Sequence, residues 1–172
     1  IKCRSAGIRP SAAVLVATIR ALKFHGGVAR EDLSEENLPA LRAGLANLNR
    51  HINNLREHYG VPAVVSINQF VADTDAEVEL VMEHCKALGV QVALSSHWAN
   101  GGAGATDLAH MVAEICDADT TPANTPHNSF VYPGELSLWE KLEAVATKVY
   151  HAREITASSK VRYRLRELTD GG

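Results

Sequence analysis

Three short runs of β-branched and other apolar residues, each followed by a helical pattern, constrain the fold of this chain more than any other feature. The runs cover residues 12–18, 63–67 and 90–94. Runs of this length and composition are typical of strands buried on both faces of a sheet. Strands that alternate with helices form parallel sheets with right-handed crossovers. The sequence therefore predicts an α/β fold, a parallel sheet with flanking helices.

The segments around these runs have the spacing of amphipathic helices. The longest covers residues 37–59, where apolar residues recur alternately every three and four positions. Another begins near Asp73 or Thr74, residue types that cap helix N-termini. The apolar positions also predict helices over residues 20–25, 108–115, 138–149 and 161–168, and a short strand over 129–132. We expect strand–helix units over 1–120, and a connection, the short strand and a helical extension over 121–172.

Charge and composition exclude several classes of partner. A net charge of −3 gives no electrostatic reason to expect nucleic acid or an anionic membrane. The longest apolar run, residues 12–17, is too short to span a bilayer. Three scattered cysteines fit neither a disulfide framework nor a zinc motif, which favours a reducing cytosol. The histidines show no metal-ligand spacing, so we predict no metal site.

Two aromatic residues, Phe70 and Trp98, follow successive predicted strands. Ligands of parallel α/β sheets gather at the carboxyl ends of the strands. Two aromatic faces at that edge could hold a flat heterocycle between them. Spacing alone favours a simpler interpretation, in which both rings cap the end of the sheet.

Polar residues near these aromatics are further candidates. Asn68 could bind a base or ribose through its amide. The Gly101-Gly102 pair lies in a predicted loop over residues 97–104 that leads into a helix. It could present backbone N–H groups to an anion, although spacing alone favours a flexible loop or an N-terminal helical turn. His97 could contact a ligand or transfer a proton, but loop histidines are more often structural. A basic segment, residues 160–166, has helical apolar spacing, which favours an amphipathic surface helix over a nucleic-acid site.

Several of these segments, in the same order, resemble formate–tetrahydrofolate ligases. Residues 14–27, with the sequence VLVATIRALKFHGG, and residues 44–54 are similar to segments of that family. Residues 68–74, NQFVADT, resemble its Asn-x-Phe-x-x-Asp-Thr pattern, and residues 98–102, WANGG, resemble its Trp-Ala-x-Gly-Gly loop. Residues 141–152 resemble a helix that ends in Ile-Tyr-Gly-Ala. The resemblance covers essentially the whole chain.

The resemblance implies a function in one-carbon metabolism. The family joins formate to N10 of tetrahydrofolate at the expense of ATP, with Mg²⁺, through a formyl phosphate intermediate. By resemblance, Phe70 and Trp98 stack on the pterin ring and Leu94 is an apolar wall of that pocket. Asn68, Gly101 and Gly102 would lie near the nucleotide. The resemblance also implies a cytoplasmic enzyme with small-molecule substrates that forms a homo-oligomer, and it assigns no general base in this chain.

The chain also departs from the family pattern. It contains no Gly-x-x-x-x-Gly-Lys-Ser/Thr motif, so we expect part of a P-loop-type NTPase-like α/β fold that lacks its P-loop. His151 stands where glycine is usual, and Val71 where proline is common. Since family members are several times longer, we expect an internal fragment that supplies the pterin half-site. The alternative is a stand-alone folate-binding or assembly module without ligase activity.

Overall fold

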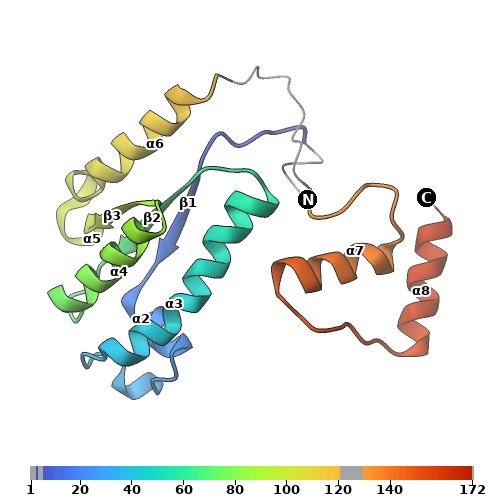
Figure 1. Ribbon diagram of the computed structural model, residues 1–172, viewed down its shortest axis with the longest axis horizontal. Helices are drawn as coiled ribbons and strands as arrows, with labels where there is room; N and C mark the ends of the chain where they lie inside the picture. Colours follow the sequence, from blue (N-terminus) through green and yellow to red (C-terminus); the bar gives the residue numbers. More distant parts are fainter. Residues whose placement is uncertain (1–2, 4–5, 121–129, 172) are drawn as a thin grey trace. The chain divides into compact units, whose positions relative to one another are not determined.

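The computed structural model describes residues 3, 6–120 and 130–171 (Figure 1). The chain divides into two compact units, one up to residue 126 and one from residue 127. The predicted boundary between residues 120 and 121 lies next to residues 121–129, which are outside the described part. Each unit is described here by itself.

A three-stranded parallel sheet forms the centre of the first unit, as the strand–helix alternation predicts. Its strands are β1 (Ala13–Ala17), β2 (Ala63–Asn68) and β3 (Gln91–Ser95), in the order β1-β2-β3. Ala17 pairs with Ile67, and Ile67 pairs with Leu94. Because the strands are parallel and in register, their carboxyl ends meet at one edge of the sheet.

The helices of the first unit follow the predicted apolar patterns closely. The predicted helix over residues 37–59 is an α-helix that continues as a π-helical turn. Residues 97–104, which we expected as a loop, instead form a short α-helix and a 3₁₀-helix. The elements are α2 (Ile19–His25), η1 (Arg30–Asp32), α3 (Leu38–Asn53), η2 (Asn54–His58), α4 (Asp75–Ala87), α5 (His97–Asn100), η3 (Gly101–Ala105) and α6 (Thr106–Ala118).

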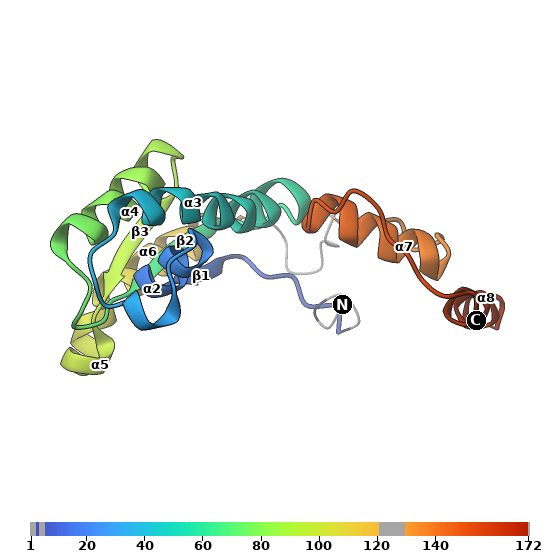
Figure 2. The same cartoon turned by 90° about the horizontal axis from the view of Figure 1, so that it is seen from below.

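The two faces of the sheet are covered unequally. Helices α2, α3 and α4 pack against one face and bury the main hydrophobic core. Helix α6 packs against β2 and β3, on the other side of the sheet from α4 (Figures 1 and 2). On β1, Val14 is 42% exposed and Val16 is 61% exposed. The prediction that this strand is buried on both faces is therefore wrong, whereas β2 is buried along almost its whole length.

The second unit contains two helical segments. Helix α7 (Leu138–Ala144) continues as the π-helical turn η4 (Val145–Val149), and α8 (Ser159–Asp170) follows. Ser137 caps α7 in a capping box with Glu140, which is the local reason why the helix starts there. The short strand predicted over 129–132 is wrong for residues 130–132, which form no strand, and Ser129 lies outside the described residues.

A buried ion pair joins α2 to α4. Lys23 Nζ lies 2.8 Å from Glu77 Oε1, and both side chains are fully buried. Lys23 also donates to the Glu35 carbonyl at 2.8 Å. Glu77 accepts hydrogen bonds from the backbone amides of Asn37 and Thr74. The pair therefore links α2, the start of α3 and the start of α4, and its polar atoms are satisfied as burial requires.

These contacts shift the pKa of Glu77. Burial acts to raise the pKa of this carboxyl, but the hydrogen bonds from Lys23, Asn37 and Thr74 outweigh burial and lower the pKa below its ordinary value of 4.5. The stabilisation from the Glu77 carboxylate is therefore fully present above about pH 4.5 and is lost as the pH falls through the folded-state pKa.

We predict that Glu77→Gln destabilises the first unit by about 3–5 kcal/mol, because it leaves the Lys23 ammonium buried without a counter-charge. Urea unfolding at pH 7 measures this free energy. As the pH falls below about 4.5 and through the lowered folded-state pKa of Glu77, the wild-type chain loses the stabilisation from this ion pair, and the variant does not.

The double variant Lys23→Met/Glu77→Gln is the control. It removes both charges, so it is more stable than Glu77→Gln alone. Equal stability of the single and double variants would contradict the role assigned to the pair.

Helices α2 and α3 approach closely at a glycine. A Cβ built on Gly44 would lie 1.9 Å from the Leu22 carbonyl oxygen, which is part of the α2 backbone. Backbone atoms cannot move away as the end of a side chain can. This close approach explains why a residue without a side chain stands at position 44, on the part of α3 that faces α2.

We predict that Gly44→Ala lowers the free energy of unfolding by about 2 kcal/mol or more, because the two helices must separate. Thermal unfolding measures the loss. Gly102→Ala is the matched control, since a Cβ there meets nothing within 4 Å. A similar loss in both variants would contradict the packing explanation, because the effect of Gly→Ala on the unfolded chain is stabilising.

Candidate functional site at the carboxyl edge of the sheet

Phe70 and Trp98 lie together beyond the carboxyl ends of β2 and β3. The strands continue to pair at this edge, where the Gln69 amide donates to the Ser95 carbonyl at 3.1 Å. Trp98 Nε1 donates a hydrogen bond to the carbonyl of Gln69 at 2.8 Å, and Gln69 directly precedes Phe70 in the chain. Phe70 is 39% exposed and Trp98 is 56% exposed. Both side chains therefore lie outside the hydrophobic core and are partly open to solvent.

A tight turn fixes Phe70. Its backbone amide donates to Asp73 Oδ2 at 2.8 Å, and the Asp73 amide donates to the Phe70 carbonyl at 3.0 Å. Thr74 follows at once and caps α4 in a capping box with Glu77. The turn that carries Phe70 is thus anchored to the buried Lys23–Glu77 pair through two adjacent residues.

The carboxyl of Asp73 is only partly satisfied. Its Oδ1 atom is buried and has no hydrogen-bond partner among the described residues. Burial raises the pKa of Asp73, although the hydrogen bond from the Phe70 amide and the positive charges of Lys23 and Arg20 act in the opposite direction. The sequence placed Asp73 in a turn at the start of a helix and in the Asn-x-Phe-x-x-Asp-Thr pattern. Its spacing, three residues after Phe70, is typical of the turn that forms here.

Ser96 forms hydrogen bonds within the short segment that carries Trp98. The Ser96 amide donates to the Gly104 carbonyl at 3.0 Å, and Asn100 Nδ2 donates to Ser96 Oγ at 2.9 Å. Gly101 has a φ of 58°, a conformation that favours glycine. Gly101 and Gly102 are exposed and lie on the same short segment as Trp98.

The remaining candidates divide between two places. Asn68 ends β2 and pairs in register with Ser95, so it lies at the same edge as the aromatics. His97 Nδ1 lies 2.9 Å from Ser95 Oγ, the structural hydrogen bond that loop histidines commonly make. Leu94 is 36% exposed but lines a separate groove against α4, which neither Phe70 nor Trp98 lines. Gln69 lines this groove too and connects it to Trp98.

The described residues contain no group of three or more His, Cys, Asp or Glu side chains that could hold a metal ion. Nor does that part of the chain contain a helix long and apolar enough to cross a bilayer. Cys3, Cys85 and Cys116 are free thiols, and burial raises the pKa of Cys85 to about 11.

Comparison with known proteins identifies the family. The family model described as formate–tetrahydrofolate ligase matches residues 1–172. This chain belongs to the formate–tetrahydrofolate ligase family. Among proteins that carry this name, it is 56% identical to one from Methylococcus capsulatus over 165 residues, which are 96% of this chain and 29% of the relative. It is 50% identical to those from Granulibacter bethesdensis and Methylibium petroleiphilum, over 100% of this chain and 29% and 30% of the relatives.

The chain thus spans about 30% of the length of the curated relatives it matches. The family resemblance inferred from the sequence motifs is confirmed over the whole chain.

We predict that Asp73→Ala frees the Phe70 amide, since no other acceptor for it is present among the described residues. Amide hydrogen exchange at Phe70 should then accelerate at least about tenfold, the equivalent of one lost hydrogen bond. Asp73→Asn keeps an acceptor oxygen and should retain most of the protection. Unchanged exchange in Asp73→Ala would show that the turn does not depend on this carboxylate.

Proposed function

We propose that the chain takes part in the ATP-dependent ligation of formate to tetrahydrofolate, which yields 10-formyltetrahydrofolate, and that it supplies the surface on which the pterin ring stacks. Membership of the formate–tetrahydrofolate ligase family supports the reaction. The finer assignment depends on Phe70 and Trp98, with Leu94 as an apolar wall and with Asn68, Gly101 and Gly102 near the nucleotide.

One observation carries the stacking proposal. The Trp98 indole N–H is already bound to the Gln69 carbonyl, so the position of the ring is fixed while the side chain stays exposed. Phe70, whose backbone amide is held by Asp73, is exposed too. Aromatic faces gain affinity by covering a flat ring, and less conformational entropy is lost because the Trp98 ring and the Phe70 backbone are already held.

In this mechanism, the role of the chain is to hold the acceptor. The two aromatics fix the pterin so that N10 meets the carbonyl carbon of formyl phosphate, which forms from formate and ATP with Mg²⁺. Positioning and charge neutralisation make the main contribution to such a transfer. The sequence contains no Gly-x-x-x-x-Gly-Lys-Ser/Thr motif, so the phosphate-binding loop of the proposed P-loop-type fold is not in this segment.

The same absence favours a second candidate function for the chain by itself, that of a folate-binding or assembly module without ligase activity. We also propose small-molecule substrates, a homo-oligomeric assembly and a cytoplasmic location. Three free thiols without disulfide spacing support the last of these.

We predict that tetrahydrofolate quenches Trp98 fluorescence saturably in a Trp139→Phe background, where Trp98 is the single tryptophan. Phe70→Ala should weaken binding at least about tenfold, because one face of the sandwich is lost. The titration is done under nitrogen and corrected for absorption by the folate.

Phe24→Ala is the matched control. Phe24 is also an exposed phenylalanine, but its ring lies against Arg30 and His25 on α2, so binding should not change. Saturable binding that is equal in Phe70→Ala and Phe24→Ala would contradict the stacking assignment. Binding without formation of 10-formyltetrahydrofolate from ATP and formate would favour the second candidate function for this chain.

A further inference from the structure

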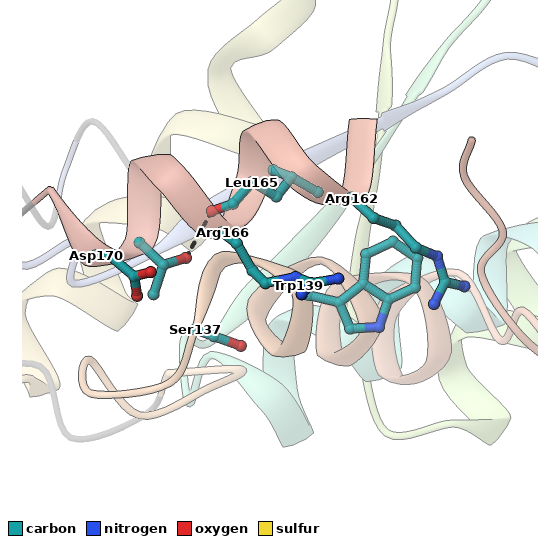
Figure 3. A pocket seen from close by; sticks show the side chains of 7 residues that line it. Ser137, Trp139, Arg162, Leu165, Arg166 and Asp170 are labelled. Carbon is teal, nitrogen blue, oxygen red and sulfur yellow. Dashed lines mark hydrogen bonds between the residues drawn. The ribbon is translucent and has the colours of Figure 1, made fainter. Parts of the chain in front are cut away.

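A pocket in the second unit is separate from the candidate site and has a different chemistry. It has a volume of about 320 Å³ and lies between α8 and the start of α7 (Figure 3). We infer that it binds a small molecule that carries a doubly charged oxyanion, a phosphate monoester or a dicarboxylate. This inference does not depend on the proposed function.

Two guanidinium groups dominate the pocket. Arg162 and Arg166 lie four residues apart on α8, so they share one face of the helix. Figure 3 shows both side chains extending from α8 toward the ring of Trp139 on α7. The Arg162 guanidinium carbon lies 4.3 Å from the centre of that ring, a cation–π contact that holds the group in place.

The surrounding carboxylates compensate these two charges only in part. Arg164, between them in sequence, pairs with Glu167 at 3.1 Å, so that glutamate is already engaged. Glu140 accepts hydrogen bonds from the amide and the hydroxyl of Ser137. Asp170 is the one carboxylate that lines the pocket, and among the described residues neither Arg162 nor Arg166 forms an ion pair. The pocket therefore keeps an excess positive charge.

The hydroxyl groups of the pocket cannot act as the main donors. Thr169 Oγ1 donates to the Leu165 carbonyl at 2.8 Å and accepts from the Leu138 amide at 3.2 Å. Ser137 Oγ donates to Glu140 at 2.7 Å. The free donors are thus the guanidinium forks, whose planar geometry matches the paired oxygens of carboxylates and phosphates.

Charge and size together select the ligand class. Like charges one helical turn apart repel, and an anion with two negative charges removes that repulsion when it bridges them. A volume of about 320 Å³ is near the lower end of ligand pockets, which fits a small molecule better than a chain segment. The Trp139 ring adds an apolar surface for the carbon atoms of the ligand.

The test is an NMR titration of the ¹⁵N-labelled full chain, followed at the Trp139 indole N–H. Spectra of Trp98→Phe assign this signal, because the chain has two tryptophans. Sodium phosphate and sodium succinate are titrated separately at constant ionic strength. Saturation in one arm and not in the other identifies the phosphate or the dicarboxylate as the preferred group.

We expect Arg166→Gln to weaken the saturable binding at least about tenfold, since charge-assisted hydrogen bonds are lost. Arg164→Gln is the matched control. It removes the same charge from the same helix at a residue whose partner is Glu167, and binding should stay within about twofold. Arg166→Lys keeps the charge without the fork and should fall between the two, which keeps the test valid if Arg166→Gln fails to fold.

The inference is overturned if neither anion gives a saturable shift of the Trp139 signal. It is also overturned if Arg164→Gln and Arg166→Gln weaken binding equally. Anion binding would then depend on the total charge of α8 and not on the guanidinium groups that line the pocket.

Discussion

The buried contact between Lys23 and Glu77 is the interaction on which most of the first unit depends. Glu77 binds the Lys23 ammonium and the amides of Asn37 and Thr74, and so reaches the starts of two helices at once. Hydrophobic packing is not directional and leaves helices free to shift along one another. A buried ion pair whose hydrogen bonds are all formed fixes the position of α2 relative to α4, because a shift of either helix leaves a buried charge without a partner.

Hydrogen bonds connect this ion pair to the candidate site. Thr74 joins the cap of α4 to Glu77, and its neighbour Asp73 holds the Phe70 amide. A turn that would otherwise move freely is therefore attached to the most tightly constrained part of the core. Trp98 is attached through the Gln69 carbonyl, which belongs to the same stretch of chain. The two rings thus share one support, so their separation is set by the strand ends and not by the flexibility of two loops.

Much of this arrangement could be predicted from the sequence, and the failures have physical causes. Helices followed from apolar spacing, and strands followed from the length and β-branched composition of the short apolar runs. Val14 and Val16 were expected to be buried because they belong to a run of β-branched residues. Such a run shows that both faces of a strand can be covered, but it does not show that a helix covers each face, and both side chains are exposed. The glycines at 101 and 102 suggested a loop, but the hydrogen bonds that Ser96 forms with Asn100 and Gly104 close this segment into helical turns. Phe70 and Trp98 were expected at one edge because neighbouring parallel strands end there, and both lie beyond the ends of β2 and β3. The separate groove at Leu94 depends on how α4 packs, which no local pattern reveals.

The aromatic pair also defines what the rest of a binding site at this edge must supply. Because the Trp98 N–H is bound to Gln69, the ring can offer a ligand only its face, and the Phe70 ring likewise has no polar group. Stacking on such faces stabilises any flat ring about equally and discriminates poorly between heterocycles. Selection among flat rings therefore requires donors and acceptors directed at the ring edge. Asn68 is at this edge of the sheet with an amide that offers both kinds of group, which makes it a candidate source of that selectivity.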